Sequence, residues 1–563
     1  MASVQTTAGG MPVLILKEGT KESKGKDAQK NNVTAAKLIA EIVKTSLGPR
    51  GMDKMLVDSL GDVTITNDGA TILKEIDVQH PAAKMMVEVA KSVDNEVGDG
   101  TTSSVVFTGS LLARAEELIS KDVHPSVIVD GYTAASEQAL KILQKIAVKV
   151  DVNDKQQLQK IARTSMDSKL VSDDSPTLSQ IVVDATKQVS EKIGDNEGLK
   201  VDLDNIKVEK KAGGSMGDTK LIKGIVLDKE VVHAGMPKRV DGARIALLNS
   251  ALEIEKTEMS AEIRINDPQQ MQMFLDEENK MLRSMVDKVI SAGANVVLCQ
   301  KGIDDIAQHY FAKEGILVVR RVKESDMFKL SKATGARLIN NLDDLTDKDL
   351  GSAELVEERK VETDKWVFIE GCKNPKAVTV LIRGGSQRVV DEADRSVHDA
   401  LMVTKDVLER PEIVAGGGST EAYIANELKQ WSGNLEGRAQ LAVQKFAEAL
   451  DSIPLGLAEN AGMDPIDTMT ELRAKQSKGS KWTGIDVRNT IVTDMFKQNV
   501  LEPVVVKEQI IKSATEAASM LLRIDDVIAS SKSKTPSPPP GGGGMGGMGG
   551  MGGMGGMGGM DME

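Results

Sequence analysis

Gly98-Asp99-Gly100-Thr101-Thr102 places a carboxylate between two glycines, with two hydroxyls directly after them, where a long helical pattern begins. Glycines let a backbone approach an anion closely, a new helix directs unpaired N–H groups at it, and a carboxylate holds the neutralising cation. The stretch therefore indicates a magnesium-phosphate pocket, and the lack of a following Walker-type lysine excludes a P-loop. Taken alone, however, an acidic glycine turn is more often an ordinary surface loop.

The length and composition indicate a soluble protein with several cores. At about 150 residues per domain, the 563 residues correspond to roughly three or four folding units. The apolar fraction of 40% and the charged fraction of 28% are those of a globular protein. Since no apolar run approaches the length of a bilayer span, we expect no membrane role.

The charge and the rare residue types exclude several other functions. A net charge of -13 and an aromatic content of 2% disfavour binding to nucleic acid. Only Cys299 and Cys372 are present, so we expect buried reduced thiols. The start Met1-Ala2-Ser3-Val4 carries no export signal, which predicts a cytoplasmic protein. The histidines show no metal-ligand spacing, and we expect structural roles for His80, His124, His233, His309 and His398.

The first 150 residues predict mainly helices. Apolar residues recur at helical spacing from Asn32 to Leu47, where Gly48-Pro49 ends the run. Alternation from Val63 to Thr66 predicts a strand that leads into the turn Asn67-Asp68-Gly69. Pro81 suits the first turn of the next helix, and another helix follows the Gly98–Thr102 stretch.

The middle and the end of the chain differ in pattern. Between residues 222 and 378, short apolar runs alternate with helical stretches, which predicts an inserted α/β domain. Within it, Asn266-Asp267-Pro268 begins a helix. After Pro411 the pattern is helical again, so the two ends of the chain can form one domain. Its expected apolar stripe is Leu441, Phe446, Ala449 and Leu450.

Four further segments carry candidate site residues, and each has an ordinary structural alternative. Leu47-Gly48-Pro49 can line a cleft or simply end a helix, and Asp68 can orient a water or form a turn. Lys169 can contact a phosphate or be solvated, and Gly416-Gly417-Gly418 can approach a ligand or be a flexible connection.

The helix after Arg383-Gly384-Gly385 allows two interpretations. Asp391, Asp394 and His398 share one of its faces, which can hold a metal or form a salt-bridged surface, the commoner case for mixed charges. Asp399 points elsewhere, and nothing in the pattern alone selects it.

Together these segments resemble the group II chaperonins, and most closely the archaeal thermosome subunits. The similarity is collinear from about Gly25 to Ile528. It is carried by Thr45–Leu56, Val63–Thr71, Glu96–Thr102, Thr164–Lys169, Arg383–Gly385, Ser396–Leu401, Val414–Gly418, Leu501–Pro503 and Arg523–Asp526. Two positions depart from the family pattern: Val93 stands where glutamine is frequent, and Thr490 stands in a stretch where glycine is usual.

The resemblance implies a multidomain fold, with a mainly α-helical equatorial domain, a mixed α/β intermediate domain, and an α/β apical domain that carries a helical protrusion. The implied ranges are equatorial 1–152 and 409–530, intermediate 153–221 and 376–408, apical 222–375 with a lid near 253–288, and a disordered Gly/Met-rich tail 531–563.

The resemblance also implies an ATPase that uses Mg²⁺ and turns ATP into ADP. Asp68 and Asp399 are the implied catalytic residues, and Asp99 is the implied metal ligand. The implied nucleotide-binding residues are Leu47, Gly48, Pro49, Gly100, Thr101, Thr102, Ser103, Ser168, Lys169, Gly417 and Glu502.

The resemblance implies that the chain binds non-native proteins. It also implies assembly with sister subunits into a homo- or hetero-oligomeric double ring of eight or nine subunits per ring. Met271, Met273 and Phe274 are candidate contacts for non-native protein, although helix packing is the expected explanation for them. Two rival functions stay open: a small-molecule kinase or ATPase without a folding chamber, and a scaffold without turnover.

Overall fold

The computed structural model describes residues 4–6, 12–14, 21–192, 198–254, 268–373 and 375–529. The chain forms two compact units: one combines Met1–Gly25 with Asp526–Glu563, and the other is Lys26–Asp525. In the first unit, β1 (Val4–Thr6) pairs with β2 (Pro12–Leu14), and β3 (Lys21–Lys24) pairs with β23 (Asp526–Ala529), both antiparallel. The expected disordered tail lies outside the described residues.

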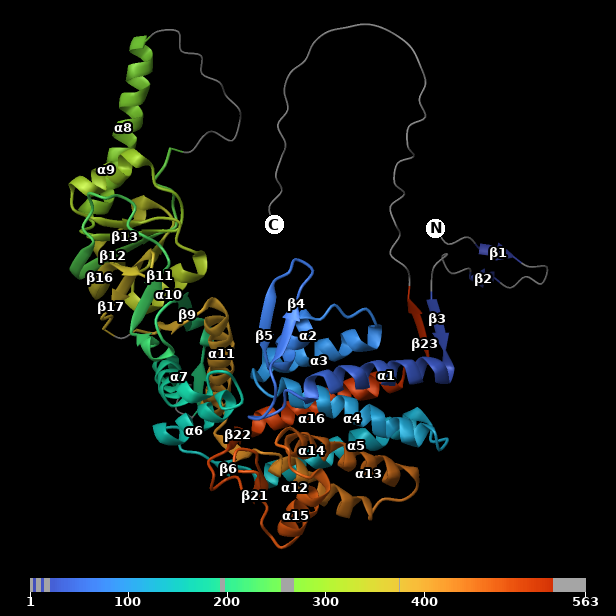
Figure 1. Ribbon diagram of the computed structural model, residues 1–563. Helices are drawn as coiled ribbons and strands as arrows, with labels where there is room; N and C mark the ends of the chain where they lie inside the picture. The colour runs from blue at the N-terminus through green and yellow to red at the C-terminus, as the bar shows by residue number, and fades with distance from the viewer. Residues whose placement is uncertain are drawn as a thin grey trace. The chain divides into compact units, whose positions relative to one another are not determined.

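In the larger unit, helices from both ends of the chain share one hydrophobic core. Phe446 packs edge-on against Phe107 and Tyr132, with ring centroids 5.3 and 5.7 Å apart, and α4 and α16 lie side by side in Figure 1. The helices are α1 (Gly25–Lys44), α2 (Gly69–Glu75), α3 (Pro81–Val97), α4 (Thr101–Ile119), α5 (Pro125–Ile146), α12 (Ser419–Ser432), α13 (Arg438–Leu450), α14 (Ser452–Asn460), α15 (Pro465–Ser477) and α16 (Val504–Leu522).

Several short strands belong to the same part of the molecule as these helices. Two antiparallel hairpins are β4 (Lys54–Val57) with β5 (Val63–Thr66), and β20 (Thr483–Asp486) with β21 (Ile491–Asp494). A three-stranded sheet has the order β22-β19-β6, from β6 (Val148–Lys149), β19 (Glu412–Ala415) and β22 (Leu501–Pro503). The sheet joins segments that are far apart in sequence.

A second group of elements surrounds a small sheet of order β10-β18-β9. In it, β18 pairs parallel with β9 and antiparallel with β10. The elements are α6 (Lys155–Met166), α7 (Ser175–Val189), β7 (Ser190–Lys192), β8 (Leu199–Val201), β9 (Ile206–Ala212), β10 (Lys220–Ile222), β18 (Val378–Gly384) and α11 (Gln387–Glu409). Helix α11 carries Asp399.

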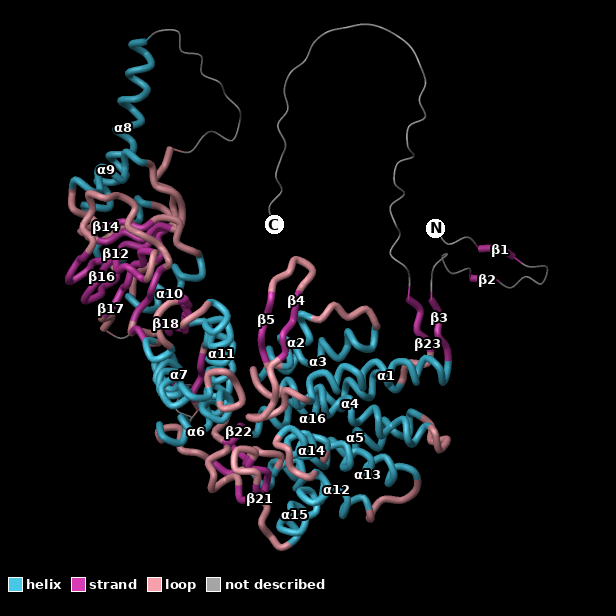
Figure 2. Tube along the Cα trace, viewed as in Figure 1, coloured by secondary structure: helices cyan, strands magenta, loops and turns pink. Residues whose placement is uncertain are grey.

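A seven-stranded sheet with its own hydrophobic core forms the middle of the chain, and Figure 2 shows the strands gathered there. The order is β11-β17-β16-β12-β13-β14, with β15 also paired to β12. The elements are β11 (Gly224–Leu227), β12 (Arg239–Leu248), α8 (Pro268–Ser291), β13 (Val296–Cys299), α9 (Asp305–Lys313), β14 (Leu317–Val319), α10 (Glu324–Thr334), β15 (Leu338–Ile339), β16 (Gly351–Val361) and β17 (Asp364–Glu370). The mixed α/β architecture is therefore established, while the exact domain boundaries stay predictions.

Two expectations about apolar residues were wrong. Met271, Met273 and Phe274 on α8 are 57%, 70% and 47% exposed, so helix packing does not explain them. Burial on α8 begins only at Leu282, because only the C-terminal half of this helix joins the core of the large sheet. Leu441 on α13 is also exposed, whereas its three expected partners are buried.

Other expectations are confirmed or concern residues outside the described ranges. Cys299 and Cys372 are buried free thiols, and burial raises the pKa of each to about 11. Helix α8 begins at Pro268, but the preceding Asn266 and Asp267, and part of the expected lid, are outside the described residues. Along the described ranges, no helix has the length and apolarity needed to cross a bilayer.

Candidate active site

A cavity of about 500 Å³ lies where the turns before α2, α4 and α12 meet the loop after α6. A cavity of this volume is in the range of small-molecule sites. Every residue that the resemblance implied for nucleotide, metal or catalysis lines it. These residues are Leu47, Gly48, Pro49, Asp68, Asp99, Gly100, Thr101, Thr102, Ser103, Ser168, Lys169, Asp399, Gly417 and Glu502.

The turn between α3 and α4 lines the cavity with backbone amides. Gly98 (φ 69°) ends α3 by donating to the Asp94 carbonyl, and Gly100 (φ 81°) precedes α4. Both residues have left-handed backbone, which glycine adopts without strain. No side chain caps α4, so its first N–H groups are available to an anion in the cavity.

Asp68 is held in place at the start of α2. Its Oδ2 accepts a hydrogen bond from the Thr71 amide at 2.8 Å, and its Oδ1 accepts one from the Thr101 hydroxyl at 3.1 Å. Burial disfavours the charged form, but Lys169 and these hydrogen bonds outweigh it and hold the pKa of Asp68 below its usual range. Asp68 is therefore an ionised carboxylate that faces the cavity.

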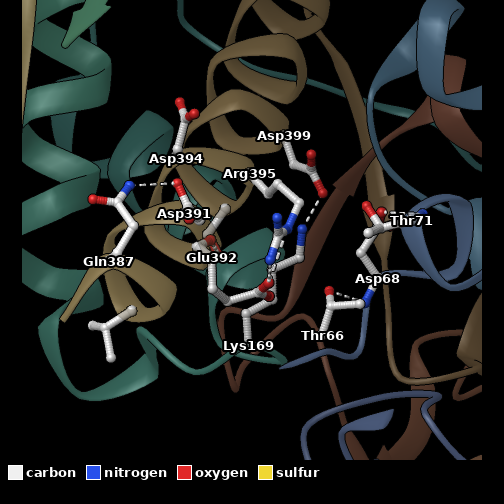
Figure 3. A network of polar contacts seen from close by, with 12 residues as sticks. Thr66, Asp68, Thr71, Lys169, Gln387, Asp391, Glu392, Asp394, Arg395 and Asp399 are labelled. Atoms are coloured by element: carbon white, nitrogen blue, oxygen red, sulfur yellow. Dashed lines mark hydrogen bonds and ion pairs between the residues drawn. The ribbon is translucent and has the colours of Figure 1, made fainter. Parts of the chain in front are cut away.

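Lys169 and Asp399 form an ion pair on the wall of the cavity, shown in Figure 3, and their side chains are 6% and 8% exposed. Burial lowers the pKa of Lys169, but Asp399, Asp68 and Asp99 more than offset this, so that its pKa is raised. Burial raises the pKa of Asp399 well above its usual range; Asp68 and Asp99 add to this effect, and Lys169 opposes it. Lys169 is thus a buried cation among three carboxyl groups, those of Asp68, Asp99 and Asp399.

The loop that carries Lys169 is bonded to the other walls of the cavity. The Asn67 side-chain amide donates to the Ser168 carbonyl. The Leu501 amide donates to the Thr164 hydroxyl at 3.2 Å. Arg488 pairs with Asp167 at 3.2 Å. These contacts connect the end of α6 to β5, β22 and the β20–β21 hairpin.

Glu502 lies on another wall, beside the glycine run before α12. A Cβ atom at Gly416 would come within 2.2 Å of Glu502 Oε1, so a larger residue there would displace this carboxyl group. Glu502 and Glu421 both pair with Lys507. Burial lowers the pKa of Lys507, but the two carboxylates outweigh it and raise that pKa. Glu502 is thus engaged with Lys507 as well as facing the cavity.

The cavity has a further wall that the sequence patterns did not single out. Asp486 organises it by accepting hydrogen bonds from the Arg488 amide at 3.1 Å and from the Asn489 side chain at 2.7 Å. The aspartate-to-asparagine spacing signals a turn but gives no hint of its neighbours. The residues of this wall are Ile485, Asp486, Val487, Arg488, Asn489, Met495, Gln498, Asn499 and Val500.

The two departures from the family pattern have clear structural positions. Val93 is fully buried on α3 and belongs to the core of the helical part. Thr490 has a φ of 55°, in the left-handed region that a β-branched residue rarely adopts. It lies in the turn between β20 and β21.

The donor set suits Mg²⁺ bound together with phosphates. Within the described ranges, no group of three or more His, Cys, Asp or Glu residues is arranged to hold a metal ion. Mg²⁺, however, needs only one or two carboxylates when substrate phosphates and waters supply the other ligands. Asp99 fits this role, because it lines the cavity and, among the residues that the structure describes, only its Oδ1 is engaged, by the Gly100 amide at 2.6 Å.

The alternative metal face on α11 is a salt-bridged surface. Lys210 pairs with both Asp391 and Asp394 at 2.9 Å, whereas His398 is exposed. The commoner of the two interpretations of this helix is therefore correct.

Comparisons with known proteins agree with the family resemblance. The TCP-1/cpn60 chaperonin family matches residues 39–532. The thermosome subunit alpha of Archaeoglobus fulgidus is 58% identical over 95% of this chain and 98% of its own length. The thermosome subunit beta of Thermococcus kodakarensis is 58% identical over 95% and 97%, and the beta subunit of Archaeoglobus fulgidus is 55% identical over 96% and 98%. The chain therefore belongs to the TCP-1/cpn60 family as a group II chaperonin of the archaeal thermosome type, an ATPase that assists protein folding.

Proposed function

We propose that the cavity described above is the ATPase site of this chaperonin subunit. The observation that carries the proposal is the convergence of Asp68, Lys169 and Asp399 beside the amide-lined turn that precedes α4. Carboxylates, the buried Lys169 ammonium group and helix amides in one cavity form a set suited to a polyphosphate and an attacking water.

Each side of the cavity has a role in this proposal. The phosphates are held by the amides of Gly100 to Ser103 and by the hydroxyls of Thr101, Thr102 and Ser103. The β20–β21 hairpin lies beside the adenine base of the nucleotide. Asp99 would hold Mg²⁺, which would supply positive charge to neutralise and orient the phosphates. Leu47, Gly48, Pro49 and Gly417 supply the remaining backbone walls, and Ser168 and Glu502 supply polar groups.

Asp399 and Asp68 orient the attacking water, and Asp399 is the better proton acceptor. Its raised pKa brings it closer to the working pH of a general base, whereas Asp68 stays ionised and fixes geometry. Lys169 then turns toward the terminal phosphate. Since Asp399 lies on α11 and Lys169 follows α6, movement of these elements controls hydrolysis.

The assembly follows from the family. The subunit joins a double ring of eight or nine subunits per ring in the cytoplasm, and the alpha and beta names of the relatives favour a hetero-oligomer. Non-native proteins bind in the chamber, and the exposed Met271, Met273 and Phe274 on α8 suit an apolar contact. The equatorial, intermediate and apical ranges are those given by the resemblance.

Two measurements test the proposal. Asp399→Ala should abolish ATP hydrolysis and spare ATP binding, whereas the control Asp391→Asn, on the same helix but paired with Lys210, should leave turnover unchanged. Retained turnover in Asp399→Ala would refute the assigned site. Electron microscopy with a hydrolysis transition-state analogue should show closed double rings; a monomer that phosphorylates a small molecule would overturn the assembly.

A further inference from the structure

Glu392 is a buried carboxylate on α11 that the steps above do not use. It is 2% exposed and lies two helical turns before Asp399, on the same side of the helix. A buried charge is costly unless it is paired and hydrogen-bonded. Its presence beside the ATP site therefore calls for a physical explanation.

Only one of the two oxygens of Glu392 is engaged. Oε2 accepts hydrogen bonds from Arg395 Nε at 2.9 Å and from Arg395 Nη2 at 2.6 Å. Oε1 is buried and has no partner with standard hydrogen-bond geometry among the described residues. Arg395 thus fixes the orientation of the carboxylate and leaves one acceptor unused.

The Thr66 hydroxyl, in turn, has a hydrogen that is not used in a hydrogen bond of standard geometry across the ranges that the structure describes. Thr66 ends β5 and is 1% exposed, and its Oγ1 accepts a hydrogen bond from the Asp68 amide at 3.1 Å. A hydroxyl also has one hydrogen to donate, and within the described part of the chain this hydrogen makes no hydrogen bond of standard geometry. Buried donors and acceptors left unpaired each cost free energy.

Helix α11 contacts β5, and at this contact the Thr66 side chain lies near that of Glu392. Burial raises the pKa of Glu392, and Arg395, Lys169 and the nearby Thr66 hydroxyl oppose this effect. The contact between Thr66 and Glu392 falls outside strict hydrogen-bond geometry. Figure 3 shows Glu392 beside Lys169, with Thr66 and Asp68 across from them. A small shift of α11 would complete the bond.

We propose that Glu392 is a positioning residue of the ATP site, which couples α11 to Asp68 through the Thr66 hydroxyl. The proposal rests on the proposed function, because it assumes that Asp68 and Asp399 act on the same phosphate. When α11 moves to seat Asp399, Glu392 Oε1 accepts the Thr66 hydroxyl. Thr66 in turn holds the amide of Asp68, so that both carboxylates reach their working positions together.

A double-mutant cycle tests this coupling in the assembled particle. We expect Glu392→Ala and Thr66→Val each to lower kcat for ATP about tenfold, the kinetic equivalent of one lost hydrogen bond, with KM for ATP unchanged. The double variant should lose no more than either single variant. Thr66→Ser, which keeps the hydroxyl, should retain activity, and so should the control Asp391→Asn.

The outcomes separate this inference from the proposed function. Additive losses in the cycle, or a Thr66→Val variant with full kcat, would overturn the role of Glu392. If Glu392→Ala fails to assemble, the comparison of Thr66→Val with Thr66→Ser decides instead. Asp399→Ala measured in parallel reports on the site itself: loss of turnover there, with full kcat in Thr66→Val, removes only the positioning role.

Discussion

Lys169 and Asp399 are 230 positions apart in the chain, yet their side chains form a buried ion pair on the wall of the proposed ATP cavity. The pair connects the loop after α6 to α11. Because both side chains are almost fully buried, each depends on the other for its charged state. The ion pair therefore links the stability of these two elements to the chemistry of the site.

Lys169→Met should destabilise the subunit and stop ATP hydrolysis. Removing one partner of a buried ion pair typically costs about 3–5 kcal/mol, because the other charge is left uncompensated. The urea midpoint of unfolding measures this loss. As a control, Lys210→Met removes the half-exposed cation that pairs with Asp391 and Asp394 and should cost about 1 kcal/mol or less.

The double variant Lys169→Met/Asp399→Asn separates stability from catalysis. It removes both charges, so it should recover most of the lost stability and yet remain without ATPase activity. Equal urea midpoints for Lys169→Met and Lys210→Met would show that the buried ion pair contributes no more to the free energy of unfolding than the half-exposed one.

Gly98→Ala should disable the site through packing. A Cβ atom at this position would come within 2.4 Å of Met402 Cβ, on the helix that carries Asp399. Displacing α11 by about 1 Å should lower kcat by about 100-fold. Gly61→Ala is the matched control, because Gly61 also has a positive φ of 91° but has nothing within 4 Å of the added atom. Similar ATPase activity in both variants would contradict the packing argument.

Local chemistry explains why much of this fold could be predicted. Helix ends are set by nearby residues: Pro81 begins α3, Gly98 ends it, and Gly100 precedes α4. The strand before Asp68 and the buried runs of β13 and β14 were equally visible as patterns. Patterns of this kind need no knowledge of the rest of the chain.

The remaining features depend on long-range packing. A single lysine in a sequence is usually solvated, and only the fold buries Lys169 against Asp399. For the same reason, the burial of Glu392 could not be predicted, because in the sequence it is one of many charged residues on the same helix. Met273 on α8 shows the reverse error, since helix packing was the expected explanation for this apolar residue and it is exposed.

Asp406 should make the subunit less stable as the pH rises. Burial on α11 raises its pKa to about 7; Glu409 and Glu96 add to this effect, and Lys405 opposes it. The unfolded value is about 3.9, so between about pH 4 and pH 7 the folded state binds a proton that the unfolded state releases. The free energy of unfolding therefore falls across this range, by roughly 4 kcal/mol at most.

Urea unfolding at pH 5 and pH 8 measures this dependence. Asp406→Asn keeps the side chain neutral at both pH values, so its midpoint should change much less than that of the unmodified protein. Asp391→Asn, which alters a half-buried carboxylate paired with Lys210, should retain the original difference. An unchanged pH dependence in Asp406→Asn would mean that another group causes it.

Thr490→Gly should stabilise the subunit. Thr490 has a φ of 55° in the turn between β20 and β21, and a β-branched residue in this region costs about 1–3 kcal/mol. Glycine adopts the same backbone without a Cβ clash but gives the unfolded chain more freedom, so we expect a net gain of about 1 kcal/mol. Asp122→Gly, at a φ of 58°, is the control, because aspartate tolerates this conformation better and the gain should be smaller. Thermal melting of both variants makes the comparison. A lower melting temperature for Thr490→Gly would show that the Thr490 hydroxyl, which donates to the Asn489 carbonyl at 2.7 Å, matters more than backbone strain.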